Sequence, residues 1–370
     1  MIMFICGDSH GDTDYMLESK DGGPGPFVLE ARKRKAEIII FTGDIAKKHL
    51  KSKLFGDLKV ICALNKEQLT DEAFQAAPPG WVLTRPGDRI YKLDEFQNIY
   101  VGHYLSFEFL AGSDAKLAQK LNEIRAANDC VRWLFSGHTH HQIYKQGHVI
   151  NFVNPGAIED SFDGHEFAVI DTANGEIVFG RIPKTTPVKP TFSVGVISDS
   201  LNISEMDPNF WQRLAEELGR RGAKDVIHVG NLALCDVGRK ELAGFQVHYY
   251  LRPDQKHDKT FDNWHLIPAE APVVDIKGYR FYVQLDLGAD LLDKSEFDMH
   301  KLCLGLRRKY PETSYVLCGL TNDAFLEEGE EVRIINPGDI LKDRNFCVVC
   351  LPRAEITFGH VPIGPLPKVT

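Results

Sequence analysis

Asp8 and His10 place a carboxylate and an imidazole two residues apart near the start of this chain. They follow an apolar run at residues 2–6, which predicts a buried strand of a parallel sheet, and Gly7, where the backbone can turn sharply. Side chains at positions i and i+2 of an extended chain point the same way, so both could bind one metal ion at the carboxyl edge of a sheet. Taken alone, Asp-x-His is equally compatible with a surface turn.

The same arrangement recurs along the first half of the chain, where a potential ligand follows each of several apolar runs. The set comprises Asp8, His10, Asp44, Asn65, His103, His138 and His140. Oxygen and nitrogen ligands in this number suit two divalent first-row metal ions bridged by one carboxylate. A single histidine or asparagine has a simpler explanation as a core or turn residue, but the ordered series predicts a metal site.

The elements that must position these residues follow from the hydrophobic pattern. Strands are predicted at residues 2–6, 37–42, 58–64, 99–101, 131–135, 149–153, 166–171 and 176–179, and helices at 28–35 and 115–127. Strands that alternate with helices and then give way to hairpin-like strands predict an α/β layer fold.

The ordered motifs resemble those of the calcineurin-like metallophosphoesterases. They are Gly-Asp-Ser-His at 7–10, Gly-Asp at 43–44, Asn65, His103, and Gly-His-Thr-His at 137–140 followed by Asn-Pro-Gly at 154–156. The resemblance covers about residues 1–180. It is greatest to the small bacterial and archaeal phosphodiesterases and to the metallophosphoesterase-like subunit of retromer. It implies a four-layer α/β/β/α sandwich with a dinuclear metal site.

Carried over by motif, the resemblance divides the ligands between two divalent ions. One ion would be held by Asp8, His10, Asp44 and His140, and the other by Asp44, Asn65, His103 and His138, with Asp44 bridging. We expect Mn²⁺, with Fe, Ni, Zn or Co as alternatives. Such a pair lowers the pKa of a bridging water and clamps phosphoryl oxygens. The implied activity is that of a metal-dependent phosphoric ester hydrolase, in which a bridging hydroxide attacks a small or nucleotide-like phosphodiester.

Lys66 departs from the family's pattern. Relatives carry Cys or His directly after the asparagine that corresponds to Asn65, and a histidine there is the candidate acid for the leaving group. Lysine, with an ordinary pKa of about 10.4, is a poor proton donor at neutral pH but can stabilise negative charge. Lys66 is therefore either a catalytic residue or a solvated lysine in a turn, and we expect phosphodiesters with acidic leaving groups to be favoured.

The second half of the chain repeats the pattern of the first. Asp199 lies 191 residues after Asp8, Asn231 lies 187 after Asp44, and the Asn-Pro-Gly at 336–338 lies 182 after that at 154–156. A smooth drift of this kind is what small deletions in a duplicated domain would leave. We therefore predict two tandem metallophosphoesterase-like sandwiches, at residues 1–182 and 191–370, joined by a Pro-rich linker at 183–190.

The ligands are not kept in this second copy. His10, His103 and His138 correspond to Leu201, Leu285 and Leu320, while Asp44, Asn65 and His140 correspond to Asn231, Arg252 and Asn322. Only Asp199 remains. The prediction is a degenerate domain without metal ligands, retained for packing, substrate shaping or contact with a protein partner.

Composition sets outer limits on function. The 370 residues are 43% hydrophobic and 26% charged, which is typical of a soluble globular protein of about two domains. The net charge of −9 argues against a protein that coats nucleic acid or a membrane. Because no signal segment or long apolar run is present, we expect a cytoplasmic protein. Cys347 and Cys350 form a Cys-x-x-Cys that we interpret as part of a core strand.

Charged and aromatic residues near the ligands leave the substrate open. The basic residues 33–35 before Asp44, and Lys47, Lys48, Lys51 and Lys53 after it, could hold a nucleotide or a nucleic-acid backbone, although a solvated helix face is the simpler interpretation. Tyr104, Phe107 and Phe109 could stack on a base but more often such aromatics are core. A small phosphodiester or nucleotide is thus favoured over nucleic acid. The alternative function is a retromer-subunit-like scaffold with a vestigial metal site.

Overall fold

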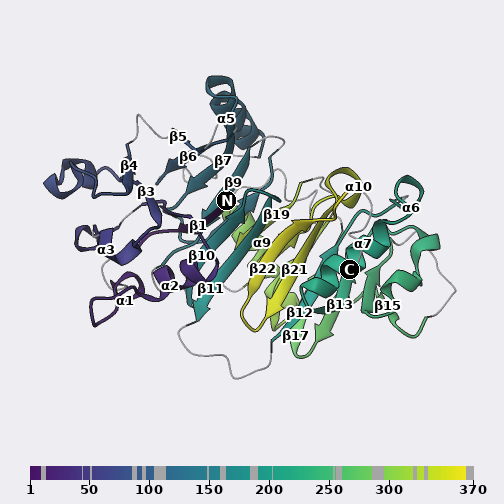
Figure 1. Cartoon of the computed structure of the whole chain (residues 1–370). Coiled ribbons are helices and arrows are strands. Elements are labelled where there is room, and N and C mark those ends of the chain that lie inside the picture. Colours follow the sequence, from purple (N-terminus) through teal and green to yellow (C-terminus); the bar gives the residue numbers. More distant parts are fainter. Residues whose placement is uncertain are drawn as a thin grey trace, which may run out of the picture. The chain divides into compact units, whose positions relative to one another are not determined.

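The computed structural model of the chain describes residues 1–9, 14–43, 45–50, 52–85, 90–93, 97–103, 114–147, 150–158, 164–183, 191–201, 203–252, 255, 261–285, 296–319, 323–328 and 332–363. The chain divides into two compact units, Met1–Pro187 and Val188–Thr370, each with two sheets (Figure 1). Some residues singled out from the sequence lie outside the described ranges: His10, Asp44, Lys51, Tyr104, Phe107, Phe109, Leu320, Asn322 and residues 184–190 of the predicted linker.

The first sheet of the first unit contains the N-terminal strand. Its strand order is β11-β10-β1-β2-β3-β4. The bounds are β1 (Ile2–Cys6), β2 (Ile38–Phe41), β3 (Lys59–Ala63), β4 (Trp81–Thr84), β10 (Gly164–Asp171) and β11 (Glu176–Pro183). Strands β1 to β4 are parallel, whereas β10 and β11 are antiparallel to their neighbours. The parallel strands are apolar on both faces because both faces are covered.

The second sheet of the first unit has the order β8-β9-β7-β6-β5. Its strands are β5 (Ile90–Lys92), β6 (Asn98–Gly102), β7 (Val131–Ser136), β8 (Gln142–Lys145) and β9 (Asn151–Pro155). The central strands β6, β7 and β9 are parallel, and the outer strands β5 and β8 are antiparallel to them. All three parallel strands therefore end at the same edge of the sheet.

Helices cover each sheet of the first unit. The helices α1 (Asp14–Leu17), α2 (Pro26–Lys33) and α3 (Ser52–Phe55) share an apolar core with the first sheet, in which Phe27, Phe41 and Phe167 are buried. Helix α5 (Asp114–Ala127) packs on the second sheet through Leu121 and Ile124 (Figure 1). Strand β9 contacts β10 and β3 contacts β6, so the two sheets face one another between the helices.

The second unit has the same strand order and directions. Its first sheet, β15-β14-β13-β12-β21-β22, comprises β12 (Phe192–Ile197), β13 (Ala223–His228), β14 (Gln246–Tyr250), β15 (Trp264–Ile267), β21 (Asn345–Leu351) and β22 (Glu355–His360). Its second sheet, β16-β17-β18-β20-β19, comprises β16 (Val273–Ile276), β17 (Tyr279–Val283), β18 (Thr313–Leu317), β19 (Phe325–Glu328) and β20 (Arg333–Asn336). The parallel strands are β12 to β15 in one sheet and β17, β18 and β20 in the other.

The helices of the second unit are α6 (Ile203–Met206), α7 (Phe210–Arg220), α9 (Glu296–Lys309) and α10 (Ile340–Asp343). Helix α7 packs on the first sheet through Trp211 and Leu214, and α9 packs on the second through Leu306. The predicted α/β class is confirmed. Among the described residues, no helix is long and apolar enough to cross a membrane.

Candidate metal centre

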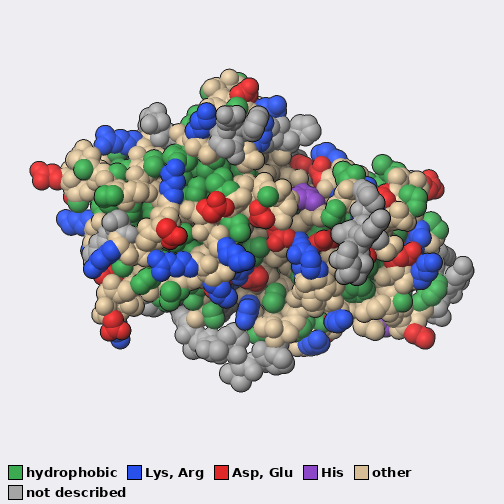
Figure 2. Space-filling model, in the orientation of Figure 1, with side chains coloured by type: hydrophobic (Ala, Val, Ile, Leu, Met, Phe, Trp, Pro, Cys, Tyr) green, Lys and Arg blue, Asp and Glu red, His purple; other side chains and the backbone are tan. Residues whose placement is uncertain are grey.

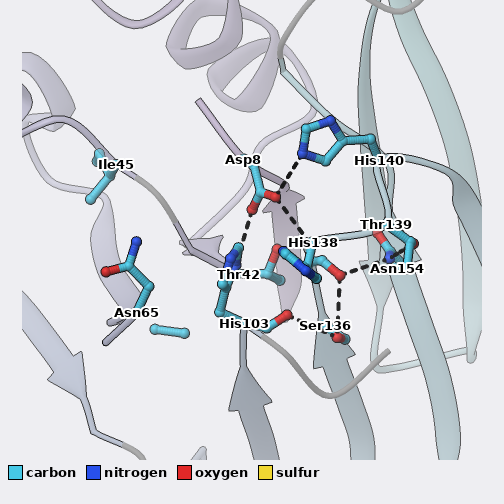
Figure 3. A network of polar contacts seen from close by, with 12 residues as sticks. Asp8, Thr42, Ile45, Asn65, His103, Ser136, His138, Thr139, His140 and Asn154 are labelled. Carbon is cyan, nitrogen blue, oxygen red and sulfur yellow. Dashed lines mark hydrogen bonds and ion pairs between the residues drawn. The ribbon is translucent and has the colours of Figure 1, made fainter. Parts of the chain in front are cut away.

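Asp8 lies at the centre of a group of imidazoles in the first unit. It lies two residues after the end of β1 and is buried. Its Oδ1 is 3.2 Å from Nδ1 of His103, and its Oδ2 is 3.1 Å from Nε2 of His140 (Figure 3). The backbone N–H of His138 donates to Oδ2 over 3.0 Å. Residues that follow two different strands, β6 and β7, thus converge on this one carboxylate.

The environment of Asp8 keeps this carboxylate ionised. Burial by itself raises the pKa of the group, because a charge is poorly solvated in the interior. The hydrogen bonds from His103 and His140, together with the positive charge these rings can carry, outweigh burial and hold the pKa of Asp8 well below its usual range. A negative charge is therefore present at this position at neutral pH.

His103 is held by an unusually close neighbour. It follows β6 and is buried, and its ring centroid lies 5.1 Å from that of His138. Gly43, just after β2, packs directly on the imidazole: a β-carbon there would lie 2.0 Å from Nδ1 of His103. Glycine is required at this position both for space and because its φ is +154°.

His138 and His140 lie on the loop after β7, which ends at Ser136. Their φ values are +74° and +58°, a left-handed conformation that is uncommon outside glycine. Gly137 brings this loop against the neighbouring strand ends, since a β-carbon there would lie 2.8 Å from Oδ1 of Asp8 and 2.7 Å from Oγ1 of Thr42. The two histidines are thus placed by backbone geometry that the residue pattern did not indicate.

Asp8, His103 and His138 form a possible site for a metal ion. One ligand atom from each lies within 4.8 Å of the other two. A carboxylate oxygen with imidazole nitrogens is a donor set that suits first-row divalent ions. The chemistry and closeness of these residues therefore fit the metal expected from the sequence.

Asn65 follows β3, as predicted, and is fixed by Gln68, a residue that the sequence did not single out. The backbone N–H of Gln68 donates to Oδ1 of Asn65 over 2.7 Å, and that of Asn65 donates to Oε1 of Gln68 over 3.0 Å. The amide of Gln68 also donates to the carbonyl of Ile45 over 2.7 Å, which ties this loop to the one that follows β2. The Asn-x-x-Gln spacing after a strand was the only signal for this contact.

Three further residues were predicted for the site: Lys66, His10 and Asp44. Lys66 is exposed in the turn after Asn65. His10 and Asp44 lie outside the described residues, although the flanking Gly43 and Ile45 are adjacent to the site. The division of the ligands between two ions, with Asp44 as the bridge, stays a prediction.

Residues 1–175 match the family model of the calcineurin-like phosphoesterase superfamily domain. No curated protein matches the sequence.

Three of the solved structures to which the chain is similar are named here with their likeness to it. Vps29 of Entamoeba histolytica is 18% identical, with 49% of this chain and 91% of that chain covered and a TM-score of 0.34. An archaeal phosphodiesterase is 13% identical, with 49% and 100% covered and a TM-score of 0.36. The phosphoesterase YfcE of E. coli is 17% identical, with 50% and 93% covered and a TM-score of 0.31. The first unit of this chain, through the match at residues 1–175, belongs to the calcineurin-like phosphoesterase superfamily.

Proposed function

We propose that the first unit is a metal-dependent phosphodiesterase that hydrolyses a small, nucleotide-like phosphodiester. The observation that carries this proposal is the convergence of Asp8, His103 and His138, whose ligand atoms lie within 4.8 Å of one another in a phosphoesterase domain. A buried carboxylate kept ionised by imidazoles is a ready ligand for a divalent cation. The same position would be costly to maintain for stability alone.

In this proposal Asp8, His10, Asp44 and His140 hold one ion, and Asp44, Asn65, His103 and His138 hold the second, with Mn²⁺ as the expected metal. Two such ions, when bound, neutralise phosphoryl charge and lower the pKa of a water molecule. The contribution of the chain is to fix the ligands beforehand. Gly43 and Gln68 support His103 and Asn65, so little rearrangement is needed when the ions bind.

The lysines around the site support an anionic substrate. Lys47 and Lys48 lie in the short helix η2 (Lys47–His49) just after Ile45, and Lys66 follows Asn65. The contact between Gln68 and Ile45 joins these two loops. On the face seen in Figure 2, Lys and Arg side chains are interspersed with Asp and Glu. This mixture favours recognition of a small nucleotide over a long nucleic acid.

We also propose that the second unit is a degenerate copy of the first. The equal strand order of the two units supports this. So do local contacts that recur at the offset of 187 residues predicted between Asp44 and Asn231. Gly230 has the same φ of +154° as Gly43. Gln255 accepts from the backbone of Arg252 over 3.2 Å, as Gln68 does from Asn65 over 3.0 Å.

The centre of the second unit is built against cation binding. Nδ2 of Asn231 donates to Oδ1 of Asp199 over 2.6 Å, and the hydroxyl of Ser198 donates to Oδ2 over 2.9 Å. Leu285 packs on Gly230 where His103 packs on Gly43, and Arg252 brings a positive charge to the position of Asn65. Neutral donors thus satisfy the one remaining carboxylate, and we propose that this unit serves substrate shaping or contact with a protein partner.

A hydrolysis screen tests the proposal. Nucleotides, cyclic nucleotides, short oligonucleotides and an aryl phosphodiester are offered in Mn²⁺ to the wild type, to Asp8→Asn and Asp44→Asn, and to Asp199→Asn as the matched control in the second unit. We expect turnover by the wild type and Asp199→Asn, with a loss of at least about 100-fold in the other two variants. Turnover that depends on Asp199, or none in any variant, would contradict the proposal. The second outcome, with metal-free protein folded, would favour the scaffold function.

A further inference from the structure

We infer that Asn154 is a positioning residue of the metal centre, although it donates no ligand. It holds the loop that carries His138 and His140 in the conformation that presents both rings to Asp8. The inference rests on the proposed function, because it concerns residues that we propose bind the ions.

The side chain of Asn154 uses all of its hydrogen-bonding groups on neighbouring loops. Asn154 lies in β9 and is fully buried. Its Nδ2 donates to the carbonyl of Gly137 over 3.2 Å and to Oγ1 of Thr139 over 2.8 Å (Figure 3). Its Oδ1 accepts from the backbone N–H of Gly156 over 3.1 Å. Both amide hydrogens therefore bind the residues on either side of His138.

The hydrogen bonds from Asn154 are needed because the backbone of the loop at residues 137–140 is strained. The positive φ of His138 and of His140 is unfavourable for a residue other than glycine, and such conformations persist only where surrounding contacts determine them. Besides Asn154, the N–H of Thr139 donates to the carbonyl of Gly137 over 3.0 Å. The amide of Asn154 fixes both ends of that short turn.

The segment that begins with Asn154 also fixes the backbone of Asp8. The N–H of Ile158 donates to the carbonyl of Asp8 over 3.0 Å. Gly7 lies so close that a β-carbon there would be 1.7 Å from the carbonyl oxygen of Gly156. Residues 154–158 thus hold the strand end that carries Asp8 and the loop that carries both histidines in one fixed arrangement.

The second unit provides a matched control. Asn336 stands in the corresponding Asn-Pro-Gly, is also fully buried, and accepts from the N–H of Gly338 over 2.9 Å, as Asn154 does from Gly156. By sequence correspondence, Leu285 and Leu320 replace His103 and His138 in this half of the chain. Replacing Asn336 should therefore disturb folding in the same way without disturbing a metal site.

The test compares Asn154→Leu with Asn336→Leu, which remove the same amide at nearly the same volume. Thr139→Val, which deletes only the acceptor hydroxyl, is a milder variant in case Asn154→Leu does not fold. Mn²⁺ alone is titrated by equilibrium dialysis, and amide hydrogen exchange of residues 137–140 is followed in the metal-free proteins.

We expect Asn154→Leu to weaken Mn²⁺ binding about 10–100-fold and to speed exchange in the loop, with a smaller effect of Thr139→Val. Asn336→Leu should lower thermal stability similarly but leave both readouts within about twofold of wild type. Equal effects of Asn154→Leu and Asn336→Leu on both readouts would overturn the inference. If the wild type bound no Mn²⁺, the proposed function would fail, and the exchange comparison would still decide the role of Asn154.

Discussion

Gly43 packs so tightly on His103 that a β-carbon at position 43 would lie 2.0 Å from the imidazole Nδ1. Gly43→Ala must therefore push His103 away from Asp8, from which it is separated by 3.2 Å. We predict a loss of Mn²⁺ affinity of at least about tenfold, measured by titration. Gly230→Ala is the matched control, because Gly230 has the same φ of +154° and faces Leu285. It should destabilise the second unit only; unchanged affinity in Gly43→Ala would contradict the account.

We predict that Arg181 is important for the stability of the first unit. The Glu166 carboxylate is fully buried, and the Arg181 guanidinium contacts its Oε1 through Nε at 2.7 Å and through Nη2 at 2.5 Å. Arg181→Met removes this cation from a buried carboxylate and should lower the free energy of unfolding by about 3–5 kcal/mol. Lys33→Met, which removes an exposed partner of Glu30, should change it by less than about 1 kcal/mol. Urea unfolding curves measure both changes. Equal losses of unfolding free energy in Arg181→Met and Lys33→Met would contradict the prediction.

We predict that the second unit loses stability in acid because of the buried His228. Burial lowers the pKa of this histidine from 6.5 to about 3, and its Nε2 lies 2.7 Å from the hydroxyl of Ser200. Because the unfolded chain binds the proton first, the stability contributed by neutral His228 is complete above pH 6.5 and is lost as the pH falls towards 3. The slope is at most about 1.4 kcal/mol per pH unit.

As the pH is lowered from about 7.5 to about 5, the free energy of unfolding should therefore fall less steeply in His228→Gln than in the wild type. His360→Gln, which alters an exposed histidine, serves as the control and should keep the wild-type slope. Parallel curves for the wild type and His228→Gln would show that His228 is not the group responsible.

Substrates with different leaving groups can show whether Lys66 stabilises negative charge on the leaving group or has no part in the reaction. It is exposed beside Asn65, where it can approach a leaving group. We predict that Lys66→Ala slows hydrolysis of alkyl phosphodiesters about tenfold and that of nitrophenyl phosphodiesters much less, because only poor leaving groups need help with their negative charge. Turnover numbers for a series of leaving groups measure this. An equal change across the series would assign Lys66 to the solvated turn.

The sequence predicted the strand ends well because this information is local. An apolar run followed by a polar residue, with a glycine between them at Asp8 and His103, placed Asp8, Asn65 and His103 within two residues of a strand end, where the structure has them. The α/β class followed from the same pattern. The family resemblance added a metal-dependent phosphoesterase chemistry that local patterns could not supply.

Contacts between distant segments were not predictable in this way. Nothing in the pattern indicated that Asn154 would donate to Gly137 and Thr139, or that His138 would adopt a positive φ. Such features depend on how the second sheet brings residues 137 and 154 together, which is a property of packing rather than of hydrophobic periodicity. The support of Asn65 by Gln68 was missed because its one signal, the Asn-x-x-Gln spacing after a strand, is too common to single out a glutamine.

The number of Mn²⁺ ions bound per chain is the most direct test of the central claim, measured by equilibrium dialysis and elemental analysis on the wild type, Asp8→Asn and Asp199→Asn. We predict two ions for the wild type and for Asp199→Asn, and fewer for Asp8→Asn, because among the described residues it is the first unit that brings a carboxylate and imidazoles together. Ions that survive Asp8→Asn but disappear in Asp199→Asn, or no ions in the folded wild type, would contradict it.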